Sequence, residues 1–178
     1  MLSLTGDTGL KSNTIKPLSL GGVSLEGKLQ RELFKFAFVR NPWQRVCSEY
    51  CYRQYDCSFD DFLLKRFPAE THENYANGDD LYRHIIPQSE CIFDHKDVLK
   101  VDCIGRFETI NEAFKALSLQ LFGHDKLLPH VNKSSSKKVL NLCNKNKVDY
   151  QSAYSDKGVQ FIEKFSARDI ELLSYRFE

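Results

Sequence analysis

Arg40, Asn41 and Pro42 mark the point where one pattern of apolar residues gives way to another. The preceding run, 34–39, is rich in aromatic and β-branched residues, which predicts a strand buried on at least one face. From Pro42 to about residue 55 the apolar residues recur at helical spacing, and Asn followed by Pro is a favourable helix start. Because free N–H groups at a helix start and a forked Arg cation both attract anions, this junction predicts a phosphate site at Arg40.

Ser48 lies two turns into the predicted helix, where its hydroxyl can donate a further hydrogen bond to a phosphate held by Arg40. Strand–turn–helix units beside an arginine also occur in proteins that bind no phosphate. A purely structural role for Arg40 and Ser48 is therefore the alternative, and the spacing alone leaves both interpretations open.

Two further groups of residues have side chains that suit the same chemistry. His84, in the string His84-Ile85-Ile86-Pro87-Gln88, can remove a proton from a hydroxyl near neutral pH, or it can simply orient a loop. Asn132, Lys133 and Ser134 offer donors that fit a phosphate or the edge of an adenine. The lysines of this region form either a solvated surface or a patch for an acidic partner. Since no aromatic residues are interleaved among them, nucleic-acid binding is not expected.

The remaining elements must place these residues around one sheet. A second strand is predicted within 98–107, and a helix over 110–122 follows it. Thr109 and Glu112 form a capping-box pattern at the start of this helix, and Gly123 fits its end. The alternation of strands and helices predicts an α/β domain around a parallel sheet.

Shorter helices are predicted on either side of these elements. Ser58 and Asp61 have the spacing of a capping pair that begins a short helix ending near Pro68. The tail contains two amphipathic segments, about 157–165 and 167–176, and Ser166 and Asp169 are the expected capping pair of the second.

Length and composition describe one soluble globular domain, with 178 residues of which 42% are hydrophobic and 28% charged. The formal net charge of +1 leaves no global field for nucleic acid or membranes, so any anion site is local. No apolar run reaches transmembrane length, and we expect no membrane segment in these residues. The 6 cysteines include no C-x-x-C pair, and no metal site is expected. Cys91 and Cys103 could form a disulfide in an oxidising compartment, with free thiols as the alternative.

Four blocks of residues, in order along the chain, resemble the carbohydrate sulfotransferase family of the sulfotransferase family 2 type. They are Phe38-Val39-Arg40-Asn41-Pro42 with Arg45 and Ser48, Ile104-Gly105-Arg106-Phe107-Glu108, Leu128-Pro129-His130-Val131-Asn132-Lys133-Ser134, and the ending from Asp169 to Phe177. The resemblance covers roughly 34–177, which is most of the chain. It implies structural roles for Gly105, where two elements pack closely, and for Glu108, which would hold nearby basic groups.

The resemblance implies a P-loop-like sulfotransferase fold, with a central parallel sheet flanked by helices in a single domain over 1–178. It implies transfer of a sulfuryl group from PAPS (3′-phosphoadenylyl sulfate) to a hydroxyl of a carbohydrate or another acceptor. In the family, the Arg and the Ser eight residues later hold the 3′-phosphate of PAPS, which implies Arg40 and Ser48 here. The loop with Asn132, Lys133 and Ser134 would approach the nucleotide, and His84 is the candidate catalytic base. The family requires no metal.

One part of the family pattern has no counterpart in this sequence. The family carries a P-K-x-G-x-T-type loop upstream of the Arg–Ser pair, where it cradles the 5′-phosphosulfate. Here residues 1–27 are predicted to be loop-rich, and the string from Gly6 to Ser12 does not fit a Walker A loop either. We therefore expect an N-terminally truncated version of the fold.

This gap leaves alternative functions open. The chain is either an active transferase or a catalytically inactive sulfotransferase-like remnant that binds nucleotide or serves as an interaction domain. A small kinase is the third possibility, which the missing Walker A loop disfavours. The expected location is cytoplasmic if the sequence is complete, and membrane-anchored or Golgi lumenal if it is part of a longer protein. The sequence predicts neither the acceptor's identity nor the oligomeric state.

Overall fold

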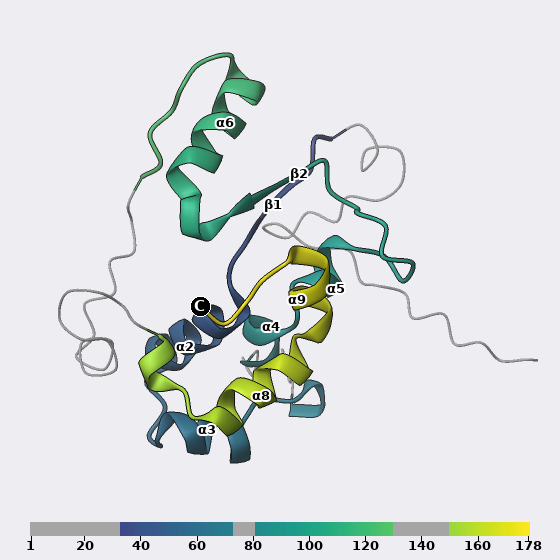
Figure 1. The fold of residues 1–178 in the computed structure, drawn as a ribbon. Helices are drawn as coiled ribbons and strands as arrows, with labels where there is room; N and C mark the ends of the chain where they lie inside the picture. Colours follow the sequence, from purple (N-terminus) through teal and green to yellow (C-terminus); the bar gives the residue numbers. More distant parts are fainter. Residues whose placement is uncertain (1–32, 73–80, 130–149) are drawn as a thin grey trace, which may run out of the picture. The chain divides into compact units, whose positions relative to one another are not determined.

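A computed structural model of the chain describes residues 33–72, 81–129 and 150–178 (Figure 1). The chain divides into two compact units, Met1–Phe34 and Lys35–Glu178, and every helix and strand described lies in the second. Residues 1–27, which the sequence predicts to be loop-rich, lie outside the described residues.

Two short strands form a parallel sheet, as the sequence predicts. β1 (Phe36–Val39) pairs with β2 (Cys103–Arg106) in a register that sets Val39 beside Arg106. Figure 1 shows the two strands side by side. Because parallel strands end at the same edge of a sheet, the residues that follow β1 and β2 leave it next to each other. The mixture of helices with a small parallel sheet is an α/β architecture.

α2 (Pro42–Arg53) begins where the sequence predicts. Asn41 is its N-cap, with a side chain that accepts hydrogen bonds from the backbone N–H groups of Trp43 and Gln44. The helix ends at Gln54, which adopts a left-handed conformation with φ 55°. The predicted strand-to-helix junction is therefore confirmed.

The other helices are shorter, apart from one that follows β2. They are α3 (Phe59–Lys65), α4 (Leu81–Ile85), α5 (Ser89–Ile92), α6 (Ile110–Phe122), α8 (Asp156–Phe165) and α9 (Ala167–Leu173), with single 3₁₀ turns η1 (Glu70–His72), η3 (Phe107–Thr109) and η4 (Gln151–Ala153). The Ser58 hydroxyl accepts from the backbone N–H of Asp61 at the start of α3, which confirms that predicted capping pair.

α6 has the predicted bounds and ends at Gly123, whose φ of 72° is the left-handed value expected of a C-terminal glycine. The predicted capping box at its start is wrong, because Thr109 makes no side-chain cap hydrogen bond. The 3₁₀ turn η3 leads directly into α6, and the N–H of Ile110 bonds to the carbonyl of Phe107 within that turn.

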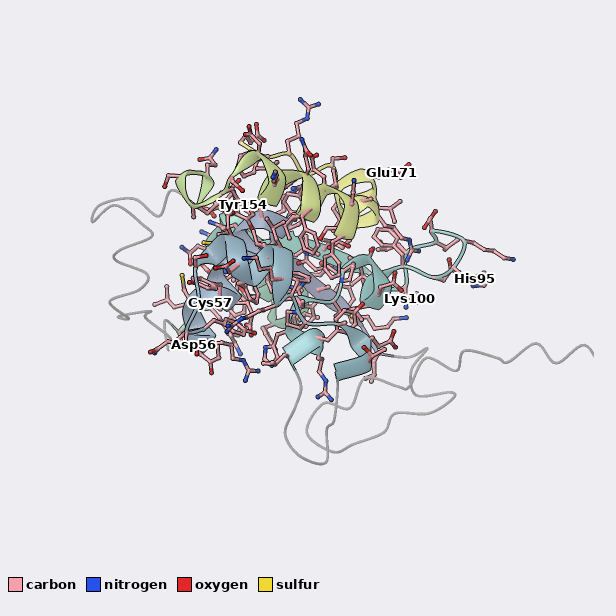
Figure 2. All side chains as sticks on the ribbon, turned by 90° about the horizontal axis from the view of Figure 1, so that it is seen from below. Asp56, Cys57, His95, Lys100, Tyr154 and Glu171 are labelled. Carbon is pink, nitrogen blue, oxygen red and sulfur yellow. The ribbon has the colours of Figure 1, made fainter. Side chains whose placement is uncertain are left out.

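The larger hydrophobic core lies where α2, α3 and α8 meet. Trp43, Phe62 and Ile162 contribute one large side chain from each helix, and none is more than 1% exposed. The Trp43 indole donates to the carbonyl of Val159 at 3.3 Å, and the Tyr154 hydroxyl, labelled in Figure 2, donates to the carbonyl of Trp43 at 2.9 Å. These hydrogen bonds attach the first turn of α2 to α8 and to the residue that follows η4.

A smaller cluster of buried apolar residues surrounds the end of β1. Its members are Val39, Ile92, Leu173 and Tyr175. They come from β1, α5, α9 and the segment after α9, which are far apart in the sequence. The last residue of β1 is therefore fixed by elements from the middle and the end of the chain.

The final helix is shorter than the sequence predicts. α9 ends at Leu173 because Ser174 adopts a left-handed conformation with φ 53° and its N–H bonds back to Ile170. Cys91 and Cys103, the pair considered for a disulfide, are free thiols. None of the helices in the described ranges combines the length and apolar character that a membrane crossing needs.

Gly105 allows β2 to pack closely against its neighbours, as predicted. A Cβ at this position would lie 2.5 Å from the ring of Phe38 and 3.0 Å from the Cβ of Ala113. The first distance is far inside van der Waals contact, so any larger residue must displace the ring or separate β2 from α6.

We expect Gly105→Ala to lower the free energy of unfolding by about 1–3 kcal/mol, because inserting a methyl group into a packed contact forces neighbours apart. Urea unfolding of the wild-type chain and the variant measures this. The same substitution in a Phe38→Leu background is the control, since it removes the ring atoms that the new Cβ meets. An equal loss in both backgrounds would contradict the proposed clash.

Candidate functional site

The corner between β1 and α2, formed by Arg40 and Asn41, is held by a side chain from a distant part of the sequence. The backbone N–H of Arg40 donates to Oε1 of Gln88 at 2.8 Å, and Nε2 of Gln88 donates to the carbonyl of Arg40 at 2.8 Å. The primary amide of Gln88 thus pairs with both backbone groups of Arg40. This replaces the hydrogen bonds that a neighbouring strand would make and fixes the backbone where β1 ends.

Asn41 is held in a similar way from the other side of the corner. Its backbone N–H donates to Oε1 of Glu108 at 2.6 Å, and its side-chain Nδ2 donates to the carbonyl of Arg176 at 2.8 Å. Its Oδ1 accepts from the N–H groups of Trp43 and Gln44 at 3.1 and 3.3 Å.

These contacts change the expected mode of anion binding. The sequence predicts that free N–H groups at the start of α2 help to bind a phosphate. In the structure the N–H groups of Arg40, Asn41, Trp43 and Gln44 all have protein acceptors, and residue 42 is a proline without an N–H. That part of the expectation is wrong, because side chains of the protein already accept hydrogen bonds from these N–H groups. Anion binding at this corner must use side chains.

The Arg40 guanidinium lies over the start of α2 with much of its hydrogen-bonding capacity unused. Its Nε donates to Oε1 of Gln44 at 3.0 Å, and its plane lies over the ring of Phe107 with 4.5 Å to the ring centroid. Within the described ranges, neither Nη atom has a protein acceptor and no carboxylate forms an ion pair with the group. Burial lowers the pKa of Arg40, and the nearby Glu108 carboxylate opposes that change. A half-buried cation whose two N–H₂ groups have no acceptor among the described residues is well suited to a forked oxyanion.

Ser48 lies on the same face of α2 as Gln44, one helical turn further along. It is half-buried, and its hydroxyl has no hydrogen-bond partner among the residues that the structure describes. Gln44 bonds directly to the Arg40 guanidinium, so it connects the Arg40 side chain to the helix face that carries Ser48. The predicted pairing of Arg40 with Ser48 is therefore compatible with this geometry.

Asp169, at the start of α9, supports the corner through Gln88. Its Oδ2 accepts from the backbone N–H of Gln88 at 2.8 Å and from Nε2 of Gln88 at 3.3 Å, and its Oδ1 accepts from the N–H of Ser89 at 2.7 Å. The residue is 1% exposed. The sequence predicts that Asp169 pairs with Ser166 to cap its own helix, and this is wrong. Ser166 makes no side-chain cap bond, and the carboxylate of Asp169 instead satisfies the start of α5.

Oε2 of Glu108, the carboxylate oxygen that does not bond to Asn41, also accepts a hydrogen bond. The Tyr175 hydroxyl donates to Oε2 of Glu108 at 3.3 Å, and burial, with a further contribution from the Glu108 charge, raises the pKa of Tyr175. A tyrosine hydroxyl is protonated at neutral pH even at its ordinary pKa, so it is the donor in this bond. Arg106 lies over the Tyr175 ring, 4.6 Å from its centroid, and donates to the carbonyl of Leu173 at 2.6 Å. Glu108 is structural, as predicted, although its direct partner is the backbone of Asn41.

His84, the candidate base, lies on α4 and faces a different side of α2. Its Nδ1 is 3.7 Å from Oε2 of Glu49, whose Oε1 also pairs with Arg53 at 3.0 Å. The His84 side chain is 38% exposed, so it remains accessible to a substrate. Glu49 follows Ser48 on α2, which turns their side chains about 100° apart around the helix. The structure thus places His84 near the helix that carries Ser48, but on an adjacent face.

Arg45 is a further, partly buried cation on α2 that the sequence did not single out as a ligand. Its Nη1 donates to the carbonyl of Ile86 at 2.7 Å, which ties α2 to the segment between α4 and α5. Burial lowers the pKa of Arg45, and the charge of Asp169 opposes this effect. Arg45 and Asp169 are therefore electrostatic neighbours beside the Gln88 contact.

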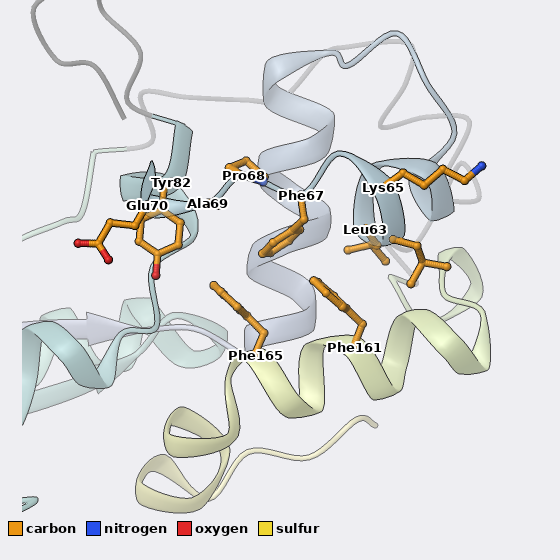
Figure 3. A pocket seen from close by; sticks show the side chains of 10 residues that line it. Leu63, Lys65, Phe67, Pro68, Ala69, Glu70, Tyr82, Phe161 and Phe165 are labelled. Carbon is orange, nitrogen blue, oxygen red and sulfur yellow. The ribbon is translucent and has the colours of Figure 1, made fainter. Parts of the chain in front are cut away.

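The remaining predicted ligands, Asn132, Lys133 and Ser134, lie outside the described residues. Within the described ranges, His, Cys, Asp and Glu side chains form no group of three that could hold a metal ion. A shallow cavity of about 400 Å³ lies elsewhere, between α3, η1, α4 and α8 (Figure 3). Aromatic rings dominate its wall, which includes Phe67, Phe161 and Phe165, and neither Arg40 nor Ser48 lines it.

Comparison with known proteins gives one positive result. A family model described as the sulfotransferase family matches residues 20–176 of the chain. No curated protein and no solved structure gives a significant match. The matched range includes β1, α2, the Gln88 contact and all but the last residues of the C-terminal segment.

The contacts of Asn41 generate a stability prediction. We expect Asn41→Ala to lower the free energy of unfolding by about 1–2 kcal/mol, because it removes the cap of α2 and the bond to the carbonyl of Arg176. Thermal or urea unfolding measures the loss.

The matched control is Asn41→Ser, since serine also caps helices but is too short to reach Arg176. It should retain more stability than Asn41→Ala. If the two variants unfold at the same denaturant concentration, the side chain of Asn41 does not cap α2 in solution.

Proposed function

Because the chain belongs to the sulfotransferase family, we propose that it transfers a sulfuryl group from PAPS to a hydroxyl, with a carbohydrate as the acceptor class. Under this proposal the β1–β2 pair belongs to a P-loop-like central sheet of the family. PAPS supplies the activated sulfuryl group and carries the 3′-phosphate by which the protein recognises it. The residues of the chain bind the donor, orient it and remove the acceptor's proton.

The observation that carries the proposal is the state of the Arg40 guanidinium. Both Nη groups lack a protein acceptor in the part of the chain that the structure describes, while Nε and the ring of Phe107 fix the plane of the group. Partial burial makes this cation costly to leave without a counter-charge. A phosphate monoester offers two oxygens in the geometry that the fork requires, and so it supplies the missing acceptors.

Ser48 contributes a second, uncharged donor to the same phosphate. Its hydroxyl lies one turn beyond Gln44 on the same helix face, and a phosphate on Arg40 would lie along that face. An arginine fork with a neighbouring hydroxyl binds a terminal phosphate more selectively than a single charge does.

His84 is the proposed general base. As the acceptor oxygen bonds to sulfur and the bond from sulfur to the phosphate oxygen breaks, the hydroxyl proton passes to the imidazole. Glu49, 3.7 Å from Nδ1, stabilises the cation that results. The partial exposure of His84 leaves room for an acceptor to approach.

The second candidate function is nucleotide binding without transfer. It needs only the Arg40 fork and the Ser48 hydroxyl, which together would hold the 3′-phosphate. Transfer of label from PAPS to a panel of carbohydrate acceptors distinguishes the two candidates, because only the first requires sulfated product. Binding of adenosine 3′,5′-bisphosphate (PAP) is expected of both.

We expect Arg40→Ala to weaken PAP binding about 10- to 100-fold, because hydrogen bonds to charged groups are worth roughly 1.5–3 kcal/mol. Ser48→Ala should weaken it about 5- to 10-fold, since a neutral donor contributes less. Isothermal titration calorimetry measures both. Arg66→Ala is the matched control, because Arg66 is exposed and pairs only with an exposed aspartate, Asp56. Unchanged affinity after combining Arg40→Ala with Ser48→Ala would refute the proposed site.

For the chemical step, we expect His84→Gln to lower kcat about 100-fold or more and to change the KM for PAPS little, since general-base catalysis acts in the transition state. His95→Gln is the control, because His95 is exposed in the turn after α5 (Figure 2). A kcat equal to that of the wild-type chain would exclude His84 as the base.

A further inference from the structure

We propose that Asp169 is a positioning residue for Arg40, acting through Gln88, and that it thereby sets how strongly the protein selects nucleotides that carry a 3′-phosphate. This inference rests on the proposed function, since it assigns a role to a residue behind the same phosphate site. It concerns α9, where the side chain of Asp169 bonds to Gln88 and Ser89 and not to Arg40 or Ser48 within the described residues.

Gln88 forms hydrogen bonds to both backbone groups of Arg40. The side-chain amide of Gln88 donates to the carbonyl of Arg40 and accepts from its N–H, both at 2.8 Å. Each bond needs the amide in one orientation, with its oxygen toward the N–H and its nitrogen toward the carbonyl. A reversed amide would place a donor against a donor and an acceptor against an acceptor.

Asp169 in turn forms hydrogen bonds to the side chain and the backbone of Gln88. A carboxylate only accepts hydrogen bonds, and Oδ2 of Asp169 lies 3.3 Å from Nε2 of Gln88. The carboxylate therefore holds the nitrogen end of the amide toward itself and toward the carbonyl of Arg40. Its bond to the backbone N–H of Gln88, at 2.8 Å, fixes the base of the same side chain.

Within the described residues, the side chain of Asp169 makes no hydrogen bond to its own helix. All three of its hydrogen bonds go to Gln88 and Ser89, and its helix begins at Ser166 without a side-chain cap. A carboxylate that is 1% exposed is costly unless hydrogen bonds and nearby cations compensate it. Arg45, whose charge interacts with Asp169, provides part of that compensation from α2 itself.

These contacts bear on the position of the Arg40 guanidinium. Arg40 has its backbone defined by Gln88 and its side chain by Gln44 and Phe107. If the amide of Gln88 can reverse, the backbone N–H and carbonyl of Arg40 lose their hydrogen bonds to it. The contacts of the Arg40 side chain with Gln44 and Phe107 remain. A forked contact with a phosphate tolerates little displacement, so recognition of the 3′-phosphate should weaken before the fold does.

The test measures nucleotide selectivity in Asp169→Asn, which keeps the shape of the side chain but can present an N–H₂ to Gln88. Titration calorimetry on the full chain gives the affinities for PAP and for AMP, which lacks the 3′-phosphate. We expect Asp169→Asn to reduce the ratio of PAP affinity to AMP affinity about tenfold, with AMP binding changed by less than about twofold. A residue that only stabilised the fold would lower the active fraction and leave this ratio unchanged.

Two further variants sharpen the result. Glu171→Gln makes the same chemical change on an exposed position of α9 (Figure 2) and should leave the ratio at its wild-type value. Gln88→Glu removes the donor to the carbonyl of Arg40 while Asp169 is intact, and it should reduce the ratio as Asp169→Asn does. It also serves as the test if Asp169→Asn does not fold.

The outcomes separate this inference from the proposed function. A wild-type chain that binds PAP no more tightly than AMP overturns the proposed function and this inference with it. A wild-type preference for PAP that survives in Asp169→Asn or in Gln88→Glu overturns the inference alone. Loss of the preference in both variants, with Glu171→Gln unaffected, supports it.

Discussion

The β1–α2 corner depends on one requirement, which is that the backbone N–H groups of Arg40 and Asn41 find acceptors where neither the strand nor the helix supplies them. Gln88 satisfies the first from 48 residues away, and Glu108 satisfies the second from 67 residues away. These two side chains bring the start of α5 and the end of β2 to the same point. An unpaired buried N–H group is costly, so these two hydrogen bonds determine how the elements meet at this edge of the sheet.

Meeting that requirement determines how the corner can bind an anion. A helix start with free N–H groups recognises negative charge in general, because its donors and dipole are common to all helices. Here the protein uses those donors itself, and among the described residues the Nη groups of Arg40 and the hydroxyl of Ser48 have no acceptor. Under the proposed function, recognition depends on these two side chains. A fork of two N–H₂ groups suits the paired oxygens of a phosphate monoester.

Local patterns in the sequence were sufficient for the strand-to-helix junction and for α6, but they predicted neither the short helices α4 and α5 nor the contacts between elements. The start of α2 at Asn41 and Pro42 and the bounds of α6 follow from apolar spacing and helix-terminal residues, and both are confirmed. The caps at Thr109 and Asp169 were predicted wrongly, because a side chain at such a position can bond to its own helix or to another chain segment. For Asp169, tertiary packing decides in favour of Gln88 and Ser89, and no local pattern contains that information.

The contacts also give a physical reason for a resemblance that extends to the C-terminal segment. Tyr175 supports Glu108, Asp169 supports Gln88, and the carbonyl of Arg176 accepts from the side chain of Asn41. Each of the two acceptors that fix the corner is thus held in turn by a residue between 169 and 176. A change in this segment is therefore expected to act on the β1–α2 corner through Gln88 or Glu108, although in the described ranges the segment makes no hydrogen bond to the side chain of Arg40 or of Ser48.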